Sequence, residues 1–257
     1  MINIEEAKDA FNNYVSQFDE KNLRVQVKKR HTLSVVNVAK IIAEKLNLSD
    51  EDISLAQLIA LLHDIGRFEQ EEIYHSFEDN EINNHAQIGV DLLFKRNLIR
   101  NFIQEDKYDE IISRAIFNHN KFEIEKGLSK KELLHCRLIR DADKTDNFKV
   151  KQYQDLKTLL GKTKEDAEKE KITDKVWQQF LAEKTIISST RVTAMDHWIS
   201  FLAWIYDYNF VPSLEYVEET KAIDKVINRL NYKDSETKNK MEYAREALHR
   251  YIREKIR

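Results

Sequence analysis

The most apolar segment of the chain ends in an imidazole and a carboxylate. Residues 58–62 are all apolar, and His63 and Asp64 follow them directly. Burying either group costs several kcal/mol unless it is paired, hydrogen-bonded or bound to a metal. A helix end near Gly66 would explain the histidine, because the helix dipole favours a cation there, but it disfavours the acid. The pair therefore predicts a metal-binding or catalytic site.

Three further histidines, His31, His85 and His119, each lie at one end of an apolar helical stripe. His31 precedes two valines at helical spacing, His85 opens the segment "NHAQIGVDLL", and His119 ends a stripe that begins at Ile112. Any one of them alone would more often be a satisfied core residue than a ligand. Because each would need its own buried partner, the three histidines and the His-Asp pair together predict a buried cluster.

Aspartates in the stretch "RLIRDADKTDNF" are further candidates. Asp143 and Asp146 share one helical face with apolar residues, and an acid in the middle of such a face needs a cation. Asp143 is therefore predicted as a ligand. Asp141 lies on the flank and is predicted to orient a histidine or to bond to the backbone. The alternative for these acids is an ordinary ion pair with Arg137 or Arg140.

The composition argues against several classes of protein. The chain has 257 residues, and its net charge of -3 does not favour nucleic acid as a partner. Having only 4 glycines and 1 proline favours a helical protein. A single cysteine, Cys136, rules out an internal disulfide and is typical of a cytoplasmic protein. The acidic N-terminus does not resemble an export signal, and no apolar run approaches the ~20 residues that span a bilayer, so no membrane partner is expected.

Apolar periodicity and capping residues predict one all-α domain over residues 1–257, with a core at about 20–150 and a C-terminal helical elaboration at about 165–257. Residues 66–83 are predicted to be irregular, and the charged residues 161–175 are predicted to be exposed. Helices are predicted over these ranges: 3–19, 24–46, 51–64, 84–95, 106–119, 130–160, 174–183, 190–208 and 236–257.

The motifs and their order resemble the HD-domain superfamily of metal-dependent phosphohydrolases. "RHTLSVVNVAKIIAEKL", "IALLHDIGRF" and "LIRDADK" carry a histidine, a His-Asp dipeptide and a downstream aspartate, and "NHAQIGVDLL" and "IFNHNKF" resemble the extra histidines of the dinuclear branch. The resemblance covers about residues 20–150. It implies an all-α HD-domain helical bundle with additional C-terminal helices.

The resemblance also implies a ligand set for one or two divalent metal ions. Asp64 would be the catalytic residue and would also bridge the two metal ions. Imidazole and carboxylate ligands suit Mn, Fe, Co, Ni or Zn better than Ca, and Mg is compatible with them. The implied ligands are His31, His63, Asp64 and Asp143 for the first metal, and Asp64, His85 and His119 for the second.

The implied reaction is hydrolysis of a nucleotide or another small phosphate ester by metal-activated hydroxide, as a phosphomonoesterase or phosphodiesterase. Arg67 and Lys144 are candidate phosphate ligands, and the alternative for both is a solvated surface charge. The "GYP" segment of the cyclic-dinucleotide branch is absent, and so is the Glu-Asp pair of the alarmone hydrolases. Two rival functions are an HD-fold di-iron oxygenase and a non-catalytic metal or nucleotide sensor. A homo-oligomer is compatible with all three.

Overall fold

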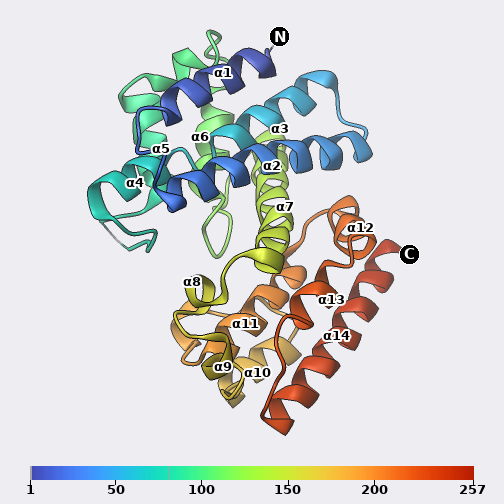
Figure 1. The fold of residues 1–257 in the computed structure, drawn as a ribbon. Helices are drawn as coiled ribbons and strands as arrows, with labels where there is room; N and C mark the ends of the chain where they lie inside the picture. The colour runs from blue at the N-terminus through green and yellow to red at the C-terminus, as the bar shows by residue number, and fades with distance from the viewer. Residues whose placement is uncertain (1, 81) are drawn as a thin grey trace. The chain divides into compact units, whose positions relative to one another are not determined.

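Every regular element in the part of the chain that the structure describes, residues 2–80 and 82–257, is a helix (Figure 1). This computed structural model confirms the predicted all-α class. The chain divides into two compact units, one ending at Asp146 and the other formed by Asn147–Arg257, with the boundary inside α7. This division does not test the prediction of one domain, which stays a prediction.

Helix α7 contributes to both units, and each of the other elements belongs to one unit. The first unit contains α1 (Ile4–Val15), α2 (Leu23–Lys45), α3 (Asp50–Leu62), α4 (Gly66–Tyr74), α5 (His85–Val90), a π-helical turn (Asp91–Lys95), a 3-10 turn (Leu98–Asn101), α6 (Asp109–Asn118) and the first part of α7 (Lys130–Tyr153). The second unit contains the rest of α7, α8 (Leu156–Leu160), α9 (Lys164–Ala167), α10 (Asp174–Leu181), α11 (Ala194–Leu202), α12 (Val211–Glu219), α13 (Ala222–Ile227) and α14 (Ser235–Ile256), with 3-10 turns at Ser188–Thr190 and Ala203–Asp207.

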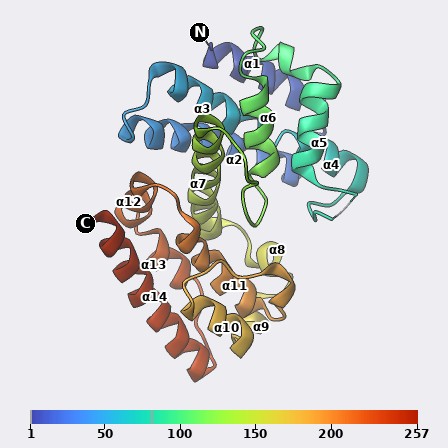
Figure 2. The same ribbon diagram turned by 180° about the vertical axis from the view of Figure 1, so that it is seen from behind.

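Helix α3 is the central element of the first unit. It lies beside α2, and both α1 and α6 pack against it (Figure 2). Its residues 58–62 are all buried, as expected for a helix whose second half is apolar on nearly all sides. Ser49 caps its N-terminus by accepting a hydrogen bond from the backbone N–H of Asp52. The buried run therefore leads directly to His63 and Asp64, which it holds inside the unit.

Helix α4 corrects the prediction that residues 66–83 are irregular. Residues 66–74 are helical, and the helix ends at His75, which adopts the left-handed conformation with φ 49°. The periodicity was not visible in the sequence because two of the buried residues, Gln70 and Glu71, are polar. They are buried through hydrogen bonds to distant residues, which a local pattern does not reveal.

Gly66 permits the close packing of α4 against α5. A Cβ atom at this position would lie 2.2 Å from the carbonyl oxygen of His85 and 2.6 Å from the backbone nitrogen of Gly89. Only glycine can occupy such a position without displacing backbone. This contact brings the start of α5, and with it His85, next to the His63–Asp64 turn.

Several predicted helices are shorter or divided in the structure. The segment predicted as 130–160 breaks after Tyr153 and resumes as α8, and the segment 190–208 consists of α11 between two 3-10 turns. The predicted helix 84–95 becomes π-helical after Val90. Helix ends depend on caps and on tertiary packing, so periodicity locates a helix better than it locates its ends.

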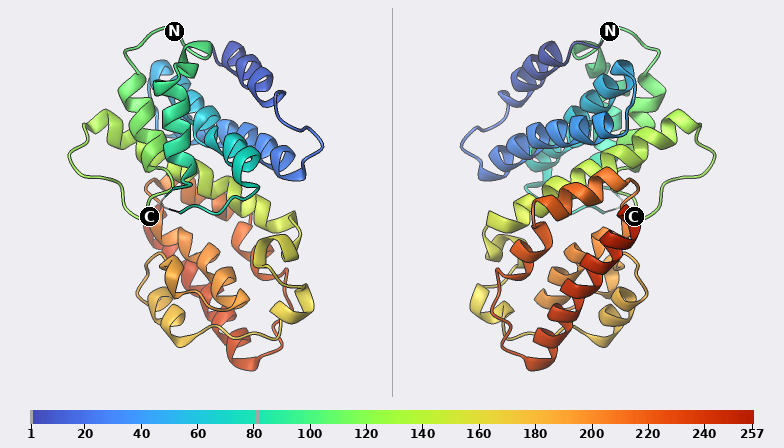
Figure 3. Two further views of the ribbon diagram at one scale, coloured as in Figure 1. Left: turned by 90° about the vertical axis from the view of Figure 1, so that its left-hand side faces the viewer. Right: turned by 90° about the vertical axis from the view of Figure 1, so that its right-hand side faces the viewer.

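The second unit has a hydrophobic core of its own. Trp198 of α11, Ile223 of α13 and Leu248 of α14 are fully buried in it. Helices α12, α13 and α14 pack against one another (Figure 3). Among the described residues, none of the helices combines the length and the apolar character that crossing a bilayer requires. The cytoplasmic location stays a prediction.

Candidate metal centre

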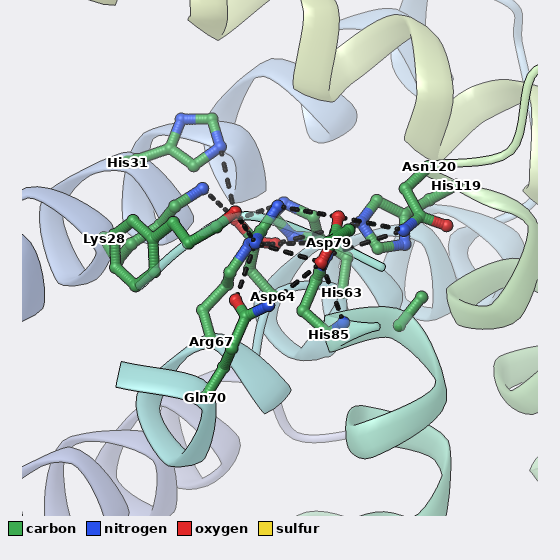
Figure 4. A network of polar contacts seen from close by, with 12 residues as sticks. Lys28, His31, His63, Asp64, Arg67, Gln70, Asp79, His85, His119 and Asn120 are labelled. Carbon is green, nitrogen blue, oxygen red and sulfur yellow. Dashed lines mark hydrogen bonds and ion pairs between the residues drawn. The ribbon is translucent and has the colours of Figure 1, made fainter. Parts of the chain in front are cut away.

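The six predicted ligands come together in the first unit from five parts of the chain. His31 lies on α2, His63 and Asp64 form the turn between α3 and α4, and His85 is the first residue of α5. His119 caps the C-terminus of α6, and Asp143 lies on α7. Figure 4 shows the four imidazoles around the Asp64 carboxylate. The four histidine side chains are at most 3% exposed, whereas the side chain of Asp143 is 22% exposed.

The two oxygens of Asp64 face different pairs of histidines. Oδ2 lies 3.4 Å from His63 Nε2 and 3.8 Å from His31 Nε2. Oδ1 lies 3.3 Å from His85 Nε2 and 3.8 Å from His119 Nε2. The carboxylate therefore belongs to two groups of candidate ligands, each with its atoms within 4.8 Å of one another.

Asp143 joins the first of these groups. Its Oδ1 lies 2.9 Å from His31 Nε2 and 3.6 Å from His63 Nε2. The first group thus offers two imidazoles and two carboxylates, and the second offers two imidazoles and the shared Asp64.

Each histidine is held from behind at Nδ1, so that Nε2 points inward. His63 and His119 donate from Nδ1 to the carbonyl oxygens of Ala60, at 2.7 Å, and Ile116, at 2.6 Å. Carboxylates hold the other two. His31 Nδ1 lies 2.7 Å from Asp146 Oδ2, and His85 Nδ1 lies 2.7 Å from Asp79 Oδ2. When the proton of a neutral imidazole is on Nδ1, Nε2 presents a lone pair, which is the arrangement of a metal ligand.

Three of the four inward-facing nitrogens fit a metal because no hydrogen-bond donor faces them, whereas His31 Nε2 lies next to Asp143 Oδ1. His63 Nε2 is buried without a hydrogen-bond partner. His85 Nε2 and His119 Nε2 lie 2.9 Å apart, so two lone pairs face each other. Such an arrangement is costly unless a cation lies between the nitrogens. Imidazole nitrogen with carboxylate oxygen is also the donor set that divalent transition metals prefer.

The electrostatics of the pocket favour an ionised Asp64, a neutral His85 and positive charge beside His63. Burial opposes ionisation of Asp64, but Lys28 and His63 outweigh it and hold the pKa of the carboxyl well below its usual range. Burial lowers the pKa of His85 to about 3, which keeps this ring neutral. Burial also opposes a charge on His63, yet the carboxylates of Asp64 and Asp143 raise its pKa to about 10. The position next to His63 Nε2 therefore favours positive charge, which a metal ion supplies as well as a proton does.

Three residues of the site were not predicted. Lys28 donates from Nζ to Asp64 Oδ2 at 2.6 Å, and its place one helical turn before His31 was a usable signal. Asp146 shares its predicted helical face with Asp143, but the sequence predicts no role for it. Asp79 follows α4 in an irregular segment, and nothing local marks it as the partner of His85.

The remaining predicted residues have mixed outcomes. Arg67 is not a solvated surface charge, because its side chain is 13% exposed and donates to the Phe77 carbonyl at 2.7 Å and to Asp79 at 3.2 Å. Its role toward phosphate stays a prediction, as does that of Lys144. Asp141 is fully buried on α7, and its predicted role behind a histidine is likewise untested.

Comparison with protein families finds one match in this part of the chain. Residues 29–147 match the model of the HD domain. This part of the chain, a little under half of its length, is similar to the HD domain. Members of the HD-domain superfamily are mostly metal-dependent phosphohydrolases, and the matched range contains all six candidate ligands. No curated protein and no solved structure matches the chain significantly.

Proposed function

We propose that this protein is a metal-dependent phosphohydrolase that acts on a nucleotide or another small phosphate ester. The observation that carries the proposal is the convergence of four buried imidazole Nε2 atoms on the two oxygens of Asp64. An arrangement in which every Nδ1 is held and every Nε2 faces a carboxylate is difficult to explain as core packing.

The residues would divide between two metal positions. His31, His63, Asp143 and Oδ2 of Asp64 would hold one ion, and His85, His119 and Oδ1 of Asp64 would hold the other. A divalent ion supplies Lewis acidity, which polarises a phosphoryl oxygen and lowers the pKa of water. The chain itself would hold the ions on either side of the Asp64 carboxylate, and the burial of the four rings excludes bulk water.

Positive side chains around Phe77, two of which reach Asp64, support a phosphate ester as substrate. Arg24, Lys28 and Arg67 lie around the ring of Phe77, at 5.9, 5.8 and 5.5 Å from its centroid. Lys28 Nζ also reaches Asp64, so an oxygen of a bound phosphate can replace this carboxylate as its partner. A cationic rim attracts an anionic substrate and orients it before reaction.

The test combines metal analysis with a phosphate-release assay. The full chain is purified without added chelator and its metal content is measured. It is then assayed with Mn²⁺ against nucleoside mono-, di- and triphosphates and against simple phosphomonoesters and phosphodiesters. We expect bound transition metal and release of phosphate from at least one substrate class. His63→Ala should abolish both, whereas His249→Ala, which removes a histidine paired with Glu218 in the second unit, should change neither.

The rival functions have distinct outcomes in the same experiment. Oxygen uptake together with an air-sensitive colour, and no phosphate release, would favour the di-iron oxygenase. Bound metal with tight nucleotide binding but no product would favour a sensor. A protein that holds no metal and releases no phosphate would refute the proposal.

A further inference from the structure

The two halves of the metal centre follow one plan. In each half, a backbone carbonyl holds one histidine and a carboxylate holds the other. In the first half these are His63 on the Ala60 carbonyl and His31 on Asp146. In the second half, the Ile116 carbonyl holds His119 and Asp79 holds His85.

The two supporting carboxylates differ in their surroundings. The side chain of Asp146 is 2% exposed, lies on the long helix α7 and also accepts a hydrogen bond from the Ser34 hydroxyl. The side chain of Asp79 is 28% exposed and belongs to the irregular segment between α4 and α5. Support for the first half is therefore part of the helical core, and support for the second half depends on a surface segment.

Asp79 joins that surface segment to the metal centre. Its Oδ1 accepts from the backbone N–H of His85 at 3.1 Å and from Gln70 Nε2 at 3.0 Å. Both carboxylate oxygens also accept hydrogen bonds from the Arg67 guanidinium, at 3.2 and 3.3 Å. The same guanidinium donates to the Phe77 carbonyl. One exposed carboxylate thus fixes the position of His85 against α4. The first half of the centre does not depend on such a surface group.

We propose that Asp79 is the positioning residue of the second metal position, and that this position can be emptied separately from the first, which Asp146 supports. The inference rests on the proposed metal centre. An acid behind a ligating histidine fixes the ring and its proton, and its loss typically costs about 10- to 100-fold in metal affinity. Because Asp79 and Asp146 hold different histidines, replacing either acid should weaken metal binding at one position only.

The experiment titrates the metal-free full chain with Mn²⁺ and follows it by calorimetry and electron paramagnetic resonance. We expect two binding events in the wild type, with the spectrum of a coupled Mn²⁺ pair at two equivalents, because Asp64 bridges both positions. Asp79→Asn should weaken the weaker event by about 10- to 100-fold, leave the tighter one within about twofold, and show isolated Mn²⁺ at two equivalents. Asp146→Asn should weaken the tighter event. Glu78→Gln, an exposed acid of the same segment, is the matched control and should behave as the wild type.

The outcomes separate this inference from the proposed function. A wild type that binds no metal refutes the proposed function. A wild type that binds two ions, with both events unchanged in Asp79→Asn, refutes only the role of Asp79. Hydrogen exchange of the His85 amide provides a measurement in the wild type, should the variant fail to fold. Its protection should rise with the second equivalent of Mn²⁺ and not with the first, and equal protection at both would overturn the inference.

Discussion

Each unit contains a deeply buried aspartate, and the two are surrounded by opposite kinds of groups. Asp64 of the first unit is 3% exposed, and Asp196 of the second is 0% exposed. Asp196 accepts hydrogen bonds from the backbone N–H groups of Thr173, Val192 and Thr193, at 2.8, 3.0 and 3.2 Å. Thr193 belongs to the capping box of α11, Val192 precedes it and Thr173 is the N-cap residue of α10, so the acid is satisfied by the fold itself.

Asp64 instead faces four imidazole nitrogens, two of which are directed at each other. Its charged neighbours include Lys28, at 2.6 Å, and the Arg67 guanidinium, at 3.7 Å. The comparison shows that a buried acid alone does not indicate a metal site. A metal site is indicated by a buried acid whose neighbouring groups also lack hydrogen-bond donors, because a cation then stabilises the acid and its neighbours together.

The largest expected effects come from replacing each of the two acids by alanine, and the two effects should differ in kind. Asp64→Ala should lose most of the bound metal and lower kcat/KM by at least about a thousandfold, since it removes the ligand shared by both positions. Asp196→Ala should leave the metal content unchanged and lower the free energy of unfolding by about 3 kcal/mol, the cost of several unsatisfied buried donors. Metal analysis and denaturant titration of both variants check this. Full metal occupancy in Asp64→Ala would contradict the site.

Gly66→Ala should damage the packing that brings His85 to Asp64. The new Cβ would collide with the backbone of α5, so we expect the free energy of unfolding to fall by about 1–3 kcal/mol and the second metal to be lost. Gly89→Ala is the matched control on the other side of the same contact, because its Cβ would meet the nearest atom at 3.4 Å, an ordinary contact distance. Equal metal content in Gly66→Ala and wild type would show that this packing does not position His85.

Lys28→Ala tests the role of the ammonium group near Asp64 independently of the imidazoles. If Lys28 binds the substrate phosphate, its loss should leave the metal content intact and lower kcat/KM by about tenfold to a hundredfold, the value of a charge-assisted hydrogen bond. Arg67→Ala should lower kcat/KM to a similar extent and also reduce the metal content, because Arg67 holds Asp79. Lys29→Ala, the next residue on α2, is the control. A Lys28→Ala variant with unchanged kinetics would remove this residue from the substrate site.

The pH dependence of the metal-free protein should report the same histidines. Since the pKa of His85 is lowered from 6.5 to about 3, its stabilising effect is complete above pH 6.5 and is lost as the pH falls from 6.5 toward 3. Since the pKa of His63 is raised from 6.5 to about 10, its contribution is complete below 6.5 and is lost as the pH rises toward 10. Each limb has a limiting slope of about 1.4 kcal/mol per pH unit.

Thermal unfolding of chelator-treated protein therefore should show a stability maximum near pH 6.5. His85→Ala should flatten the acid limb and His63→Ala the alkaline limb. A curve whose two limbs are unaffected by the histidine variants would assign the pH dependence to other groups.

The sequence by itself determined the helical class, the order of most helices and the identity of six candidate ligands. Helical periodicity and capping are local properties, so they can be read within a few residues of each position. The His63–Asp64 pair stood out because it ends an apolar run, and His31, His85 and His119 stood out because each ends an apolar stripe. Chemically conspicuous residues on otherwise apolar faces are visible without knowing what they contact.

Only the tertiary structure decided which groups hold and surround those ligands. The pairing of Asp79 with His85, of Asp146 with His31 and of Lys28 with Asp64 joins residues on different elements. Helix α4 was missed for the same reason, because its buried Gln70 is satisfied by Asp79 and by the carbonyl of Asn83. Such contacts depend on how helices cross in space, and a carboxylate in an irregular segment carries no local mark of the imidazole it will meet.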